Sequence, residues 1–127
     1  MKLLLDTHAF LWAIWGRNLS ETAQDAYLDA HNELYLSAAS YWEMCLKISI
    51  GKLTVIPDWI KRFDTEIVGN GIKWLSIEKE HCRQLTALPQ LHRDPFDRLL
   101  IAQAQAEGMT LLTADANIQQ YPISTLW

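Results

Sequence analysis

The stretch that decides the fold is Lys2-Leu3-Leu4-Leu5-Asp6, in which a run of leucines ends in a carboxylate. A short, uninterrupted apolar run is typical of a central strand that a parallel sheet buries on both faces. A comparable run, Met109–Thr113, is followed by Ala114 and Asp115. Ligands of open parallel sheets bind outside the carboxyl ends of the strands. We therefore expect Asp6 and Asp115 to lie together at one edge of a parallel sheet.

Strands and helices alternate along the rest of the sequence. Thr7–Trp15 is expected to form a helix that ends at Gly16, and Ser20 is a favourable N-cap for the next helix. This alternation predicts parallel β-α-β units, and hence an α/β fold of the three-layer α/β/α sandwich type, although spacing does not set the strand order. Further helices are expected over about 40–50, from Pro57, before Pro89, and from Asp94-Pro95 to about Glu107, where Gly108 ends the last of them. Strands are expected at Leu34–Leu36, at Ile72–Ile77 and from Ile123.

Length and composition narrow the class of protein. With 127 residues, 50% of them hydrophobic, the sequence suits a single domain over residues 1–127. Ala9–Trp15 is too short to span a bilayer and no secretory signal is evident, so we expect no membrane association and a cytoplasmic location. Cys45 and Cys82 suit reduced thiols. A net charge of −4 argues against broad nucleic-acid binding but does not exclude a nucleic-acid enzyme that holds a cation.

Four carboxylates stand where a predicted strand ends or a predicted helix begins. Carboxylates gathered in one place repel one another and would partly take up protons unless a cation neutralises them. Their joint placement therefore predicts a divalent metal site. No zinc-ligand spacing, phosphate-binding glycine loop or nucleophile elbow competes with this interpretation. The four acids are Asp6, Glu43, Asp97 and Asp115.

Local structure offers an alternative explanation for two of these acids. Asp6 can cap the helix that starts near Thr7, because aspartate is a favoured N-cap. Ser40 and Glu43 have the S-x-x-E spacing of a capping box. Lys47, four residues after Glu43, can form an ordinary surface ion pair with it. Capping and metal binding both stay open at these positions.

The other two acids have similar alternatives. Asp94 precedes Pro95, which suits the first helical position, so Asp94 is expected to be the N-cap of that helix. Asp97 then lies one turn inside the helix, from where it can point across a pocket. Asp115 can cap a short turn through Asn117.

Four segments in this order carry a family resemblance: Leu4–His8, Ser37–Glu43 with Lys47 and Gly51–Leu53, His92–Ala104, and Leu111–Asp115. With them, the sequence strongly resembles the PIN-domain ribonucleases, particularly the VapC toxins of bacterial toxin–antitoxin pairs. The match runs nearly from end to end. Each segment alone is modest evidence, and their shared order and spacing make the resemblance specific.

The resemblance implies a parallel sheet of about five strands and an acidic pocket for Mg²⁺ or Mn²⁺. It also implies an RNA substrate, a cognate VapB-like antitoxin and a homodimer. By motif position, the family's catalytic and metal-binding acids fall on Asp6, Glu43, Asp97 and Asp115. Supporting polar neighbours would be Thr7, Ser40 and Thr113, with Asp94 as an additional acid.

Basic side chains near the predicted pocket are candidate contacts for RNA phosphates. They are Lys47, Arg93 and Arg98, with His92 as a further candidate. The alternative is that these charges are solvated or paired with neighbouring acids. Nothing in the sequence indicates a surface that reads RNA bases, so we expect recognition of RNA shape and exposed single strands.

Two other functions stay open from the sequence. A receiver-like phosphoacceptor domain is also a small α/β fold with clustered aspartates, but it needs a lysine after its last strand, and Ile123–Trp127 contains none. A non-catalytic interaction module would use the same acids as helix caps only. Metal-dependent cleavage of RNA distinguishes a nuclease from such an interaction module.

Overall fold

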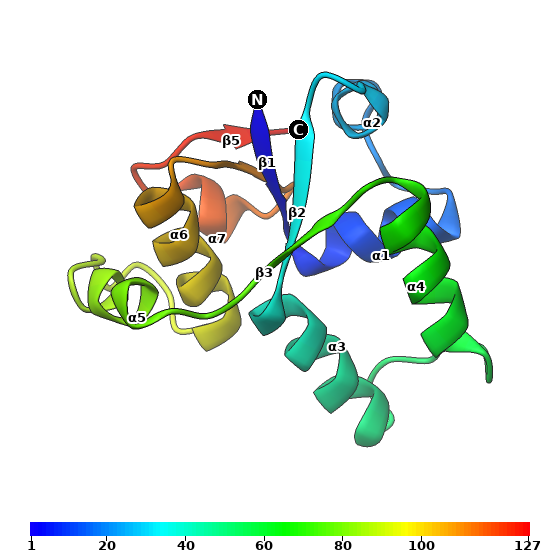
Figure 1. The fold of residues 1–127 in the computed structure, drawn as a ribbon. Helices are drawn as coiled ribbons and strands as arrows, with labels where there is room; N and C mark the ends of the chain where they lie inside the picture. Colours follow the sequence, from blue (N-terminus) through cyan, green and yellow to red (C-terminus); the bar gives the residue numbers. More distant parts are fainter.

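The computed structural model describes residues 1–127 and contains one sheet of five strands, all parallel. The order of the strands is β3-β2-β1-β4-β5 (Figure 1). The predicted α/β fold with about five parallel strands is therefore confirmed. The strands are β1 (Lys2–Leu5), β2 (Glu33–Ser37), β3 (Lys73–Leu75), β4 (Thr110–Leu112) and β5 (Thr125–Leu126).

The leucine run occupies the centre of the sheet, as its composition predicts. Leu4 pairs in register with Tyr35 of β2 on one side and with Leu111 of β4 on the other. Leu3, Leu4 and Leu5 are completely buried, because both neighbouring strands and both faces of the sheet are covered. The polypeptide leaves the sheet at Asp6, whose backbone N–H still donates to the Leu112 carbonyl at 3.2 Å.

Helices cover both faces of the sheet. Figure 1 shows α1, α2 and α4 on one side of the strands and α5, α6 and α7 on the other. The helices are α1 (Thr7–Trp15), α2 (Glu21–Leu28), α3 (Ala38–Ser49), α4 (Trp59–Gly69), α5 (Lys79–Thr86), α6 (Pro95–Glu107) and α7 (Ala116–Gln119).

The alternating leucines of β1 divide the interior into two cores. The first core contains Leu3 and Leu5 and packs against α1, α2, α3 and α4, with Phe10 and Phe63 in edge-to-face contact at 5.4 Å between ring centroids. The second core contains Leu4, on the opposite face, and packs against α6 and α7. The sheet is thus the middle layer of an α/β/α sandwich, and its carboxyl edge lies between the two helical layers.

Two helix starts differ from the sequence-based prediction. Helix α3 begins at Ala38, because Ser37, the last residue of β2, caps it through a bond from the Ala39 N–H to Ser37 Oγ at 3.0 Å. Helix α4 begins at Trp59, two residues beyond Pro57. In contrast, the predicted ends of α1 at Gly16 and of α6 at Gly108 are confirmed, since both glycines adopt the left-handed conformation that closes a helix.

No helix combines the length and the apolar content that a membrane crossing requires.

Candidate active site

The four predicted acids come from four different elements, and the fold brings them to the carboxyl edge of the sheet. Asp6 follows β1 and Asp115 follows β4, the neighbouring strand. Glu43 lies in the second turn of α3, which follows β2, and Asp97 lies in the first turn of α6. We call these four residues the acidic edge.

Asp6 is buried and both of its carboxylate oxygens are engaged. Oδ1 accepts from the Ala9 N–H at 2.6 Å, so Asp6 is the N-cap of α1. Oδ2 accepts from the Thr113 hydroxyl, a bond that joins residues 107 positions apart. Burial raises the pKa of Asp6, and the nearby Asp115 carboxylate raises it further, while the bonds from Thr113 and Ala9 oppose the shift.

Thr113 connects two members of the acidic edge. Its hydroxyl donates to Asp6 and accepts from the backbone N–H of Asp115 at 3.0 Å. Asp115 in turn caps α7 by accepting from the Asn117 N–H at 2.8 Å. The predicted cap is therefore present at Asp115, and it leaves Oδ2 of the same carboxylate without a hydrogen-bond partner.

Glu43 is buried, and two side chains meet its carboxylate. Thr7 donates to Oε1 at 2.6 Å and Lys47 donates to Oε2 at 2.7 Å. The Lys47 side chain is 39% exposed, so the pair lies at the boundary between the core and solvent. Thr7 and Thr113 thus occupy equivalent supporting positions, each holding one buried acid of the edge.

The capping-box interpretation of Glu43 is wrong. Ser40 lies within α3 because Ser37 supplies the cap, so the Ser40 backbone has no need of a reciprocal bond from Glu43. Ser40 Oγ is instead a fully buried hydroxyl without a hydrogen-bond partner. Three residues apart on a helix, Ser40 and Glu43 share a face.

Asp97 is surrounded by other carboxylates. Burial and the Asp94 carboxylate raise the pKa of Asp97 to about 6, and Asp115 and Glu43 raise it in the same direction. A bond from the His92 ring, with Nε2 at 3.2 Å from Oδ2, opposes the shift. These three carboxylates are therefore near enough to Asp97 to disfavour its negative charge.

Asp94 is a helix cap, as predicted. Its Oδ1 accepts from the backbone N–H groups of Phe96 and Asp97 at 2.9 and 3.1 Å. Pro95 occupies the first helical position, where its missing N–H has no consequence.

The three basic candidates have different surroundings. Arg93 is exposed, and Lys47 is paired with Glu43. The prediction that Arg98 contacts RNA phosphates is wrong, because Arg98 is buried and does not lie at a solvent-exposed rim. Its Nη1 donates to the Pro89 carbonyl at 2.8 Å and to the Tyr121 hydroxyl at 3.0 Å, which commits the guanidinium to the interior of the second core.

The donor atoms of the acidic edge fit a divalent cation that keeps part of its water shell. No three histidine, cysteine, aspartate or glutamate side chains stand close enough together to hold one ion by themselves. Mg²⁺ does not need such a cage, because it keeps several of its waters and binds proteins through one or two carboxylates. The oxygen-only donors and the raised pKa of Asp97, which a nearby positive charge would reverse, both suit a hard cation of this kind.

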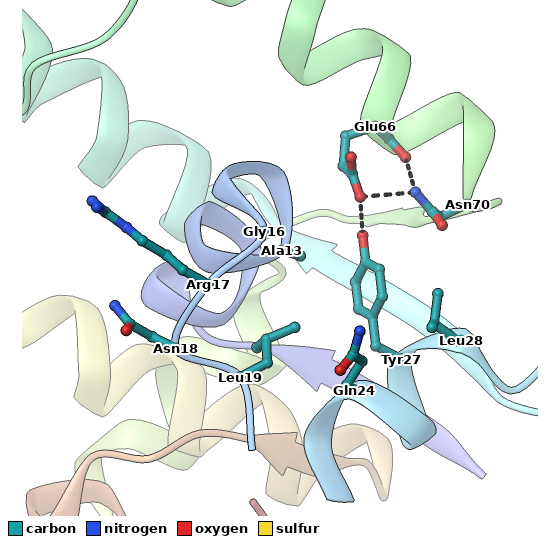
Figure 2. A pocket seen from close by; sticks show the side chains of 10 residues that line it. All are labelled: Ala13, Gly16, Arg17, Asn18, Leu19, Gln24, Tyr27, Leu28, Glu66 and Asn70. Atoms are coloured by element: carbon teal, nitrogen blue, oxygen red, sulfur yellow. Dashed lines mark hydrogen bonds between the residues drawn. The ribbon is translucent and has the colours of Figure 1, made fainter. Parts of the chain in front are cut away.

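One hollow of the surface lies away from the acidic edge, between α1, α2 and α4. It has a volume of about 540 Å³ and includes Tyr27, Glu66 and Asn70 among its walls. Figure 2 shows the Tyr27 hydroxyl and the Asn70 amide both bonded to the Glu66 side chain, at 2.6 and 2.9 Å. Burial and the bond to Glu66 raise the pKa of Tyr27. The Tyr27 hydroxyl thus has its hydrogen-bond partner within the fold.

Sequence reasoning missed the side chains behind Asp97. The sequence suggests His92 only as a phosphate contact, whereas its ring lies between Asp97 and Tyr121. Nothing in the sequence points to Tyr121, whose hydroxyl contacts both His92 and Arg98. No local pattern predicts these contacts, because Tyr121 is far from His92 and Arg98 in the sequence and meets them only in the folded protein.

Several solved structures share this fold. VapBC2 from Rickettsia felis, solved bound to a DNA fragment from its promoter, gives a TM-score of 0.77 at 17% identity, covering 98% of this chain and 97% of that chain. DNA-bound VapBC from Salmonella typhimurium gives 0.71 at 15% identity, covering 98% and 96%. A toxin–antitoxin complex from Klebsiella pneumoniae gives 0.61 at 18% identity, covering 94% and 92%.

Comparison with curated proteins finds no match. In the comparison with protein families, the model of the PIN domain family matches residues 3–123, nearly the whole sequence. The parallel sheet, the acids at its carboxyl edge and this match agree, and the chain belongs to the PIN domain family.

Proposed function

We propose that this protein is a metal-dependent endoribonuclease, a VapC-type toxin that hydrolyses RNA phosphodiester bonds and is neutralised by a cognate antitoxin. The observation that carries the proposal is the gathering of acids at the carboxyl edge of a PIN fold, with Asp97 held where three other carboxylates raise its pKa. Buried charges of the same sign destabilise a fold, and a bound cation would neutralise them.

Asp6 and Asp97 are proposed as the residues that hold Mg²⁺ or Mn²⁺ most directly. Bound there, the cation supplies Lewis-acid stabilisation of the negative charge that grows on the phosphate. Glu43 and Asp115 complete the site by orienting water molecules. Thr7 and Thr113 fix two of these acids through their hydroxyls, and Ser40, next to Glu43 on α3, has a hydroxyl free to join the same network.

Hydrolysis adds water across one phosphorus–oxygen bond of the RNA backbone. The hydroxyl of the water ends on phosphorus and a proton ends on the departing ribose oxygen. Glu43 and Asp115, as carboxylates, can accept the proton that the attacking water loses. Asp115 has an oxygen without a hydrogen-bond partner, which suits this role.

Contacts to the RNA backbone are proposed for Arg93 and Lys47. Arg93 is exposed beside His92, on the loop that leads into α6. Lys47 is already paired with one oxygen of Glu43, so an RNA phosphate would share the Lys47 ammonium group with Glu43. Arg98 is excluded from this role by its burial against Pro89 and Tyr121.

The proposed partners follow from the related structures. VapBC2 and VapBC are solved as complexes, and the Klebsiella pneumoniae relative is a toxin–antitoxin complex. We propose that the present chain likewise binds a VapB-like antitoxin, forms a homodimer and acts in the cytoplasm. Light scattering of the purified protein tests the dimer, and a monomer at every concentration would contradict it.

A second candidate function is a non-catalytic interaction module. It is favoured by one observation, that Asp6, Asp94 and Asp115 all serve as N-caps. The receiver-like alternative is wrong, because the chain belongs to the PIN domain family.

Purified protein incubated with structured and unstructured RNAs distinguishes the two functions. We expect cleavage with Mg²⁺ or Mn²⁺ and none with a chelator. Asp6→Asn and Asp97→Asn are expected to lower the cleavage rate by at least 100-fold, because charge is lost while shape and much of the hydrogen bonding remain. Both variants should keep their far-UV circular dichroism.

The matched control is Asp25→Asn, which removes one negative charge at an exposed position of α2. This control is expected to cleave RNA at the wild-type rate. Cleavage by Asp6→Asn and Asp97→Asn at that same rate would mean that the activity does not come from the acidic edge, and the interaction module would then be the better interpretation.

A further inference from the structure

His92 stands between Asp97 and a buried tyrosine. Its Nε2 is 3.2 Å from Asp97 Oδ2 and its Nδ1 is 2.8 Å from the Tyr121 hydroxyl. The two rings also meet edge-to-face, with 5.4 Å between their centroids. A neutral histidine ring presents one donor and one acceptor, so the role of each nitrogen depends on which of them carries the proton.

The hydroxyl of Tyr121 decides where that proton lies. Its oxygen receives two N–H groups, from Arg98 Nη1 at 3.0 Å and from the His92 backbone at 3.3 Å. Arginine and the backbone N–H can only donate, so both lone pairs of the hydroxyl oxygen are used. The hydroxyl therefore has nothing left to accept with, and its own proton must point toward His92 Nδ1.

With Nδ1 accepting, the ring proton lies on Nε2 and points at Asp97 Oδ2. We propose that His92 is a positioning residue for Asp97, and that Arg98 and Tyr121 fix the tautomer which lets it donate. The inference rests on the proposed function, because it is there that Asp97 is given a role in holding the cation.

The bond from His92 settles which oxygen of Asp97 is free. Oδ2 receives the ring N–H, and Oδ1 accepts no hydrogen bond and is not among the buried unpaired atoms. The carboxylate is therefore held in one orientation, with Oδ1 presented to incoming ligands. Replacing a side chain that orients a metal-binding group in this way typically lowers metal affinity by about 10- to 100-fold.

The same contacts have a purely structural alternative. Arg98 ties the Pro89 carbonyl to α6, and Tyr121 ties the loop before α6 to the end of α7, so the network also holds that loop in place. On this alternative, His92 could be replaced by any residue that fills its volume, and its tautomer would have no effect on Asp97.

Nuclear magnetic resonance of the metal-free protein tests the tautomer directly. Two-bond correlations between the ring protons and nitrogens of His92 distinguish a proton on Nε2 from one on Nδ1. We expect the Nε2 form in the wild type and a mixture of both forms in Tyr121→Phe, which keeps the ring but removes the hydroxyl. A wild-type ring protonated on Nδ1 would overturn the proposal.

Binding of Mn²⁺ alone, measured by electron paramagnetic resonance without RNA, tests the consequence. His92→Leu is expected to weaken Mn²⁺ binding by about 10-fold or more, the range found for orienting residues. His92→Gln is expected to recover most of the affinity, since its amide can donate from near the position of Nε2. Equal affinity of wild type and His92→Leu, or no recovery in His92→Gln, would overturn the proposal.

A matched control is His31→Leu, because His31 also bonds an aspartate, Asp29, but in full solvent exposure at 3.0 Å. It should bind Mn²⁺ as the wild type does. Failure of the proposed function would look different. In that case the wild type would cleave no RNA, while the tautomer of His92 and its effect on Mn²⁺ binding would still be observed.

Discussion

Asp97 lies where burial and neighbouring carboxylates both disfavour its negative charge. Its carboxyl is largely buried, Asp94 is three residues before it, and Asp115 and Glu43 approach from other elements. Together these raise its pKa from 3.8 to about 6. The folded protein therefore binds a proton at Asp97 more readily than the unfolded chain does, which links the stability of the fold to pH.

In metal-free buffer, we predict that the free energy of unfolding falls as the pH rises from about 4 to about 6. Between these values Asp97 holds more protons in the folded state than in the unfolded state, so raising the pH favours unfolding. The pKa of Asp6 is also raised and contributes in the same direction. The total attributable to Asp97 is no more than about 3 kcal/mol. Urea denaturation at a series of pH values measures it.

Asp97→Asn is the control for that prediction, because the amide has nearly the same shape and does not titrate. Its stability should change less between pH 4 and 6 than that of the wild type, and it should exceed the wild type above pH 6. Addition of Mn²⁺ should stabilise the wild type and not the variant. A wild-type protein that becomes more stable over this interval would show that the carboxylates are not crowded as described.

At the scale of elements, the acidic edge depends on a link between the two central strands. Thr113 follows β4 and is completely buried, yet its hydroxyl reaches Asp6 at the end of β1 and also accepts from the Asp115 N–H. One hydroxyl thus sets the distance between two acids that lie far apart in the sequence.

We predict that Thr113→Val lowers the free energy of unfolding by about 1–3 kcal/mol, because it leaves a buried carboxylate oxygen and a backbone N–H without their partner. RNA cleavage should fall as well, since Asp6 and Asp115 lose their common support. Chemical denaturation and the cleavage assay measure the two effects. Thr113→Ser keeps the hydroxyl and is expected to recover most of the cleavage, and a serine variant as impaired as the valine variant would contradict this explanation.

Elements with strong local signals were predicted well from the sequence. The glycines that end α1 and α6 and the Asp94-Pro95 start of α6 depend on a few adjacent residues, and all were identified. The S-x-x-E pattern at Ser40 misled, because Ser37 at the end of β2 competes for the same capping role and only the position of the strand end decides between them.

Contacts between distant segments were the part that the sequence could not supply. Arg98 reads as a surface charge within its own helix, and its burial depends on Tyr121 and Pro89, which approach from other segments. The strand order could not be predicted for the same reason, since spacing along the chain does not say which strands become neighbours. Asp6 and Asp115 could be proposed from the sequence because each follows a strand, and Asp97 because it lies in the first turn of a helix.

At the scale of the whole molecule, two cores share one sheet. Leu3 and Leu5 belong to the first core and Leu4 to the second, so neither core exists without β1. Trp59 and Trp127 lie against the first core, and no tryptophan belongs to the second. The fluorescence of these two side chains therefore reports on one face of the sheet, while circular dichroism reports on helices of both faces.

We predict that unfolding followed by tryptophan fluorescence and by circular dichroism gives coincident curves. The sharper test is Leu100→Ala, which removes a buried side chain of the second core and should lower stability by about 2–5 kcal/mol. Because the cores share β1, the fluorescence signal from the first core should shift to lower denaturant by the same amount as the dichroism signal. A dichroism curve that shifts while fluorescence stays in place would show that the two faces unfold separately.

The central place of β1 also governs when the acidic edge can assemble during synthesis of the protein. The ribosome makes Asp6 first, and its partner Thr113 emerges 107 positions later. Until then β1 lacks β4 on one side, and a nascent chain has no completed set of acids. For the ribonuclease proposed above, translation itself keeps the growing polypeptide harmless to the messenger and the ribosomal RNA that surround it.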